Sequence, residues 1–146
     1  MELEQLDGVV HEPTGDPRGV VLLTHGAGGN RDSPLLIQLC DEWASRGWTA
    51  IRYNLPYRRR RPKGPPSGSA ASDQAGIAEA IAYARELTDG PVIAGGHSYG
   101  GRMTSAVIAG AAQPGTAGHR SGTAVIASTA QPGADLLALS SYPLHP

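Results

Sequence analysis

The sequence has few of the features that direct a protein to a membrane, to nucleic acid or to an oxidising compartment. One cysteine in 146 residues excludes an internal disulfide. No apolar run approaches the roughly 20 residues of a membrane-spanning helix, and no basic-then-apolar leader opens the chain. The formal net charge of −1 gives no general attraction to nucleic acid or acidic lipid. We therefore expect a soluble, cytoplasmic protein without a nucleic-acid or membrane partner.

The 20 glycines and 12 prolines indicate many turns rather than disorder, because apolar clusters recur along the whole chain. The length fits a single domain, 1–146. Apolar runs typical of strands alternate with amphipathic segments typical of helices, which predicts an α/β fold with a mostly parallel sheet and helices on both faces. The expected strands are 6–11 (at an edge), 19–24, 48–54, 91–96 and 136–141. The expected helices begin at Ser33, at Ser72 or Asp73, and at Tyr99, and a long loop covers 55–71.

The most informative stretch is the end of the strand expected at 91–96. There Gly96-His97-Ser98-Tyr99-Gly100 follows the pattern G-x-S-x-G. In a nucleophile elbow this pattern places a serine on a sharp strand-to-helix turn, and its glycines let strand and helix approach closely. Ser98 is the only serine of the chain in such a context, so we predict that Ser98 is a catalytic nucleophile.

Acyl transfer by a serine also needs backbone N–H groups that stabilise the developing oxyanion. One donor is expected at Tyr99, directly after the nucleophile. The other is expected at Ala27, in the glycine-rich loop after the buried strand 19–24, where α/β proteins place ligands. Loop support is expected from His25, Gly26, Gly28, Gly96 and Gly100.

Two further features are open to more than one interpretation. The run Arg58–Arg61 is either a solvated, proline-stiffened loop near the site or an anion-binding rim for acidic substrates or a partner.

The second feature is a repeat: the segment 106–115 recurs as 124–133 with eight of ten positions identical. We interpret this repeat as a local duplication that inserts a connection at about 113–131, in which the second copy forms a separate short element.

Five segments together resemble a known family: 24–33, 53–57, 61–66, 95–102 and 141–145. They are similar to small bacterial α/β-hydrolases, the dienelactone-hydrolase-like proteins related to the hydrolase-like domain of the third subunit of the non-specific-lethal complex. The resemblance implies an α/β-hydrolase fold, a cytoplasmic location, no cofactor or metal, and a serine hydrolase that acts on small-molecule ester or acyl substrates.

The chain departs from that family at its end, because the family continues with two more strands that carry the catalytic acid and histidine. We therefore expect the fold to lack its last two strands, with an exposed sheet edge that favours self-association. Asp135 and His145 would lie at opposite ends of the strand 136–141, roughly 20 Å apart. His145 alone could act as a base, without a supporting acid. The alternative function is a non-catalytic module that binds ligands or proteins through the same site.

Overall fold

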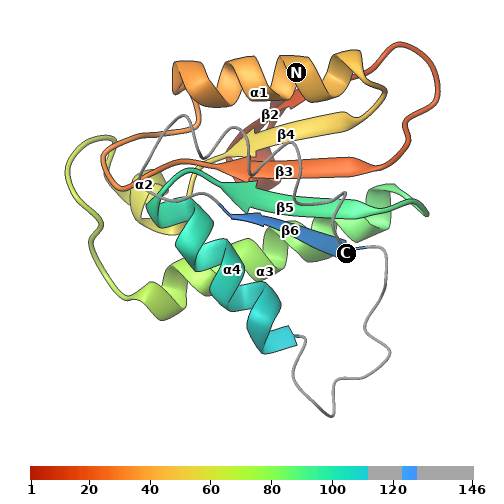
Figure 1. Ribbon diagram of the computed structural model, residues 1–146. Coiled ribbons are helices and arrows are strands. Elements are labelled where there is room, and N and C mark those ends of the chain that lie inside the picture. The colour runs from red at the N-terminus through yellow and green to blue at the C-terminus, as the bar shows by residue number, and fades with distance from the viewer. Residues whose placement is uncertain (112–122, 128–146) are drawn as a thin grey trace.

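The computed structural model describes residues 1–111 and the backbone of 123–127. Its strands form one sheet in the order β1-β2-β4-β3-β5-β6 (Figure 1). The four strands β4, β3, β5 and β6 are parallel, so the expectation of a mostly parallel sheet is confirmed. At one side β2 pairs antiparallel with β4, and β1 pairs antiparallel with β2. The bounds are β1 Glu2–Leu3, β2 Gly8–His11, β3 Val20–Thr24, β4 Thr49–Tyr53, β5 Val92–Gly96 and β6 Thr123–Ala127, and a 3-10 turn covers Glu4–Leu6.

Helices cover both faces of this sheet, as expected. Helix α1 (Pro34–Ser45) packs on one face, and α3 (Ala70–Leu87) and α4 (Tyr99–Ala111) pack together on the other (Figure 1). The short helix α2 (Pro56–Arg60) lies at the end of the sheet where β5 turns into α4. Residues 55–71 are therefore not one long loop: Pro56 begins a helix, because its fixed φ suits a first helical position.

The core consists of two apolar layers separated by the sheet. Every residue of β3 is buried, as its unbroken apolar sequence predicts for a central parallel strand. Alternate side chains face opposite layers, so Val21 packs with α1 while Leu22 packs with α3. Cys40 belongs to the α1 layer, and burial raises the pKa of its thiol to about 12. The thiol therefore stays protonated and unreactive at neutral pH.

Helix α3 begins earlier than expected, and its cap is neither Ser72 nor Asp73. The Ser69 hydroxyl accepts a hydrogen bond from the backbone N–H of Ser72 at 3.1 Å, and the helix starts at Ala70. Asp73 is instead buried inside the first turns, with only 1% of its surface exposed.

This cap can be tested by stability. We expect Ser69→Ala to lower the free energy of unfolding by about 1 kcal/mol, because one N–H of the first turn loses its acceptor. Ser72→Ala is the matched control and should change it by less than about 0.5 kcal/mol. Urea unfolding of both variants measures the difference. A larger loss in Ser72→Ala than in Ser69→Ala would contradict the assignment.

The edges of the sheet differ in detail from the expectation. The strand β2 is not an edge strand, because β1 pairs with its outer side. At the other edge of the described sheet, β6 pairs in parallel with β5 and falls inside the segment 113–131, so part of the expected connection belongs to the sheet. The expected strand 136–141, Asp135 and His145 lie outside the described residues, and self-association through an edge stays a prediction. No helix among the described residues is long and apolar enough to cross a membrane.

Candidate active site

A sharp turn joins β5 to α4 and carries Ser98. The strand ends at Gly96 and the helix begins at Tyr99, which leaves two residues to reverse direction. Ser98 has φ +54°, and Asp7 is the only other non-glycine residue in the described part of the chain with positive φ. This conformation costs a serine roughly 1–2 kcal/mol, so the surrounding structure must impose it. The Ser98 carbonyl accepts the N–H of Arg102 at 2.9 Å, which closes the first turn of α4.

The two glycines that flank the turn are required by close packing. A Cβ at Gly96 would lie 2.8 Å from the Thr24 carbonyl oxygen, at the end of the neighbouring strand β3. A Cβ at Gly100 would overlap the carbonyl oxygen of His25 and lie 2.8 Å from Thr24 Cγ2. The start of α4 therefore packs directly on the end of β3, and only residues without a side chain permit this approach.

The glycine-rich loop after β3 lies beside Ser98. A Cβ built at Gly26 would be 3.6 Å from Ser98 Cβ and 3.3 Å from His97 Cδ2. Ala27 follows in a tight turn, closed by the Gly29 N–H donating to the Gly26 carbonyl at 3.1 Å. A Cβ at Gly28 would meet open space, so packing does not require glycine at that position. The structure thus brings the loop that carries Ala27 together with Ser98 and Tyr99.

His25 anchors this loop through both ring nitrogens. Its Nε2 accepts the Leu55 N–H at 3.1 Å, so the proton must reside on Nδ1, which donates to the Gly26 carbonyl at 2.8 Å. Burial lowers the pKa of His25 to about 4, which keeps the ring neutral at pH 7. Because Nε2 is occupied by a backbone donor, His25 cannot take a proton from Ser98 without breaking this bond.

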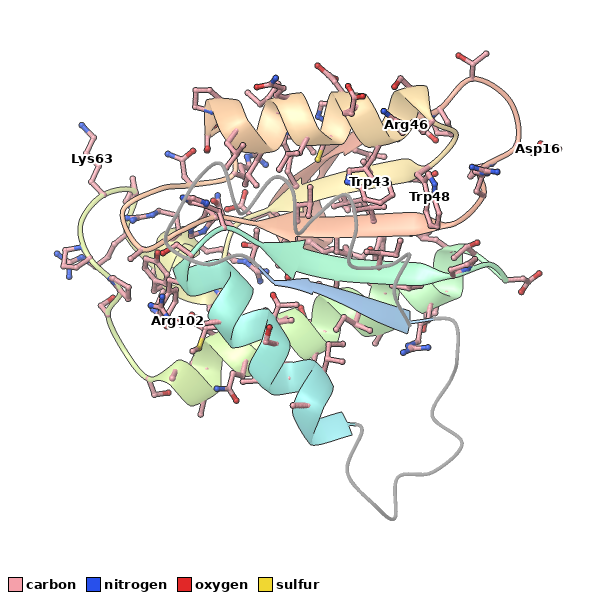
Figure 2. The ribbon with its side chains drawn as sticks, viewed as in Figure 1. Asp16, Trp43, Arg46, Trp48, Lys63 and Arg102 are labelled. Carbon is pink, nitrogen blue, oxygen red and sulfur yellow. The ribbon has the colours of Figure 1, made fainter. Side chains whose placement is uncertain are left out.

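Sequence reasoning missed the buried polar side chains behind the loop. Arg58 is only 4% exposed, and its guanidinium donates to backbone carbonyls of the loop, including Gly29 at 2.7 Å. The interpretation of Arg58–Arg61 as a solvated run is therefore wrong for Arg58, whereas Arg60 and Arg61 are exposed. Figure 2 shows Lys63 extending outward from the following loop, away from Arg102 on α4. Binding of an anion by the exposed Arg60 and Arg61 stays a prediction.

His11 is too far from Ser98 to act as its base. His11 lies at the opposite end of the sheet, because its partner in β4 is Ala50 near the start of that strand. Its ring contacts Asp41 at 2.8 Å and Arg52 at 2.9 Å. Within residues 1–111, no group of three or more histidine, cysteine or acidic side chains is placed to hold a metal ion.

Comparison with known proteins agrees with this fold. The family model described as alpha/beta hydrolase domain matches residues 17–146. The chain therefore belongs to the alpha/beta-hydrolase family. Among curated proteins, no sequence matches it significantly.

Solved structures of several hydrolases share the fold at low sequence identity. A Silicibacter sp. TM1040 protein, provisionally described as a thioesterase, is 19% identical with a TM-score of 0.56, over 92% of this chain and 49% of its own. A carboxyl esterase from Bacillus coagulans is 16% identical with a TM-score of 0.57, over 83% and 38%. Acyl-protein thioesterase 2 from Zea mays is 16% identical with a TM-score of 0.50, over 93% and 68%. The chain thus spans about half the length of the first of these proteins and less of the second.

Proposed function

We propose that the chain is a serine hydrolase for ester or thioester substrates, with Ser98 as its nucleophile. The observation that carries this proposal is the strained backbone of Ser98, held between β5 and α4 beside a glycine-rich loop. Strain of this kind persists only where the surrounding packing imposes it, and it is concentrated at functional sites. The esterase and thioesterase structures that share the fold support the same class of reaction.

The proposed reaction follows from these positions. Ser98 Oγ loses its proton to a base and attacks the substrate carbonyl carbon, and the carbonyl oxygen becomes an oxyanion. The N–H groups of Ala27 and Tyr99 stabilise that oxyanion; Tyr99 is the first residue of α4, where N–H groups have no acceptor within the helix. The carbonyl re-forms, and the alcohol or thiol leaves with the proton that the base took from Ser98. Water then gives a proton to the base and attacks the acyl carbon, and Ser98 recovers its proton as the acid is released. His145 remains the candidate base.

The finer assignments rest on the sequence motifs. Segments 24–33 and 95–102 support a dienelactone-hydrolase-like enzyme related to the hydrolase-like domain of non-specific-lethal complex subunit three, acting in the cytoplasm on small molecules. Hydrolysis of a panel of lactones and linear esters would test this substrate class. A uniform preference for long acyl chains over lactones would contradict it.

A fluorophosphonate probe tests the nucleophile. Its phosphorus is attacked by an activated serine, fluoride leaves, and a stable adduct remains. We expect one adduct per chain in the wild type and none in Ser98→Ala. Ser105→Ala, which removes a half-buried serine from the same helix, is the matched control and should label within about twofold of the wild type.

Two outcomes would contradict the proposal: no adduct on the folded wild-type protein, or an adduct that persists in Ser98→Ala. The alternative, a non-catalytic binding module, predicts the first outcome together with ligand affinity that Ser98→Ala leaves unchanged.

A further inference from the structure

Buried and half-buried hydrogen bonds connect the two elements that carry the proposed oxyanion donors. Asp73, on α3, accepts the Tyr99 hydroxyl at 2.7 Å and lies 3.4 Å from the backbone nitrogen of Tyr57, which donates to it. The Tyr57 and Tyr99 rings meet edge to face with their centroids 6.0 Å apart. One carboxylate therefore holds both the first residue of α4 and the helix α2 that packs behind the glycine-rich loop.

The Tyr57 hydroxyl continues this connection into the loop. It lies 2.8 Å from the Ala27 carbonyl oxygen and 3.1 Å from that of Gly26, so its single proton is shared between them or alternates. The Gly26 carbonyl and the Ala27 N–H belong to one planar trans peptide and point in opposite directions. Fixing the Gly26 oxygen therefore fixes the direction in which the Ala27 N–H points.

Arg58 holds the remainder of the loop. Its guanidinium donates to Ala27 at 3.2 Å and to Gly29 at 2.7 Å, and it stacks on Tyr57 with Cζ 4.9 Å from the ring centroid. Its other bonds go to the carbonyls of Arg61 and Gly64, at 3.0 and 2.7 Å. A buried cation that donates to four backbone carbonyls orders the backbone and leaves little of its hydrogen-bonding capacity for a ligand.

We propose that Tyr57, Arg58 and Asp73 are positioning residues that set the Ala27 and Tyr99 N–H groups at the separation an oxyanion requires. This inference rests on the proposed function. None of the three side chains needs to touch the substrate. Burial and the bond to Asp73 raise the pKa of Tyr99 to about 12, so its hydroxyl remains a donor at neutral pH.

The inference can be tested with conservative variants that remove single hydroxyl groups. We expect Tyr57→Phe and Tyr99→Phe each to slow the inactivation step kinact of fluorophosphonate labelling by on the order of ten- to a hundredfold, because misplaced donors stabilise the transition state less well. The binding constant KI should stay within about twofold. Tyr83→Phe, on a half-buried tyrosine of α3 that packs against the same core, is the matched control and should leave kinact unchanged.

The double variant, which combines Tyr57→Phe with Tyr99→Phe, gives a result that a merely structural role would not produce. The Tyr57 backbone N–H and the Tyr99 hydroxyl share the Asp73 carboxylate, and the two rings are in contact. The combined loss in kinact should therefore be smaller than the product of the single losses. Thermal melting of each variant separates this effect from unfolding. If kinact in Tyr57→Phe and Tyr99→Phe equals that of Tyr83→Phe, the inference is overturned.

Failure of the proposed function would be recognised separately, as absence of any adduct in the wild type. In that case the proposed positioning of Ala27 is tested by amide hydrogen exchange alone. Tyr57→Phe and Tyr99→Phe should accelerate exchange at the Ala27 N–H relative to Tyr83→Phe. Unchanged exchange at Ala27 would overturn the inference even without catalysis.

Discussion

Gly100→Ala is expected to lower the free energy of unfolding by about 2 kcal/mol or more. The added methyl group would overlap the His25 carbonyl oxygen and meet Thr24 Cγ2 at 2.8 Å, so α4 must move away from β3. Overpacking typically costs about 1–3 kcal/mol and occasionally more, and because this clash is with a backbone oxygen we expect a cost at the upper end of that range. Replacing glycine by alanine inside a helix returns about 1 kcal/mol, which is too little to offset the clash.

Gly110→Ala is the matched control, because it makes the same replacement in the same helix where a Cβ meets nothing within 4 Å. We expect it to raise the free energy of unfolding by up to about 1 kcal/mol. Urea denaturation of both variants measures the difference in sign. If Gly100→Ala also stabilised the protein, the close packing of α4 on β3 would be refuted.

Acidification is expected to remove roughly 3 kcal/mol of stability through His25. Its pKa is about 4 in the folded protein and about 6.5 in the unfolded chain. The unfolded chain therefore binds more protons between these values, so stability rises with pH there. The contribution is complete above pH 6.5 and is lost as the pH falls through 4, and the 2.5-unit difference at about 1.4 kcal/mol per unit gives the magnitude.

This dependence should disappear when the ring is replaced. His25→Gln supplies an oxygen that can accept the Leu55 N–H but does not titrate. Between pH 6.5 and 4, the slope of the unfolding free energy against pH should therefore fall by the equivalent of roughly one bound proton, about 1.4 kcal/mol per pH unit. Urea unfolding at several pH values measures both slopes. Equal slopes in the wild type and in His25→Gln would show that the ring is not held neutral in the fold.

The sequence predicts best the elements that depend on a few neighbouring residues. The apolar run that becomes β3 and the glycine-flanked serine after β5 predict a buried strand and a tight turn from a few neighbouring residues, although packing on β3 is what holds Ser98 in its strained conformation. The repeat shows the limit of such reasoning. Its first Ala-Val-Ile-Ala, 106–109, lies in α4, while the identical second copy, 124–127, lies in β6. Tertiary context, not intrinsic propensity, decides between them.

The candidate site also contains some residues that local sequence predicts and others whose roles depend on tertiary packing. Ser98 and the loop around His25 could be located because each follows directly from a strand end. The roles of Tyr57, Arg58 and Asp73 depend on how α2 and α3 pack behind that loop, which no spacing along the chain reveals. Asp73 resembled a helix cap because acidic residues are common in first turns. A buried carboxylate between two tyrosines can be recognised only in the folded protein.

The most direct test of Ser98 as nucleophile is the mass of the acyl-enzyme formed with an activated ester. After brief exposure to p-nitrophenyl acetate, we expect a burst of about one equivalent of nitrophenolate and one acetyl group on the peptide that contains Ser98. Ser98→Ala should show neither. An acetyl group confined to another residue, or a folded wild-type protein without burst or adduct, would contradict the proposed hydrolase.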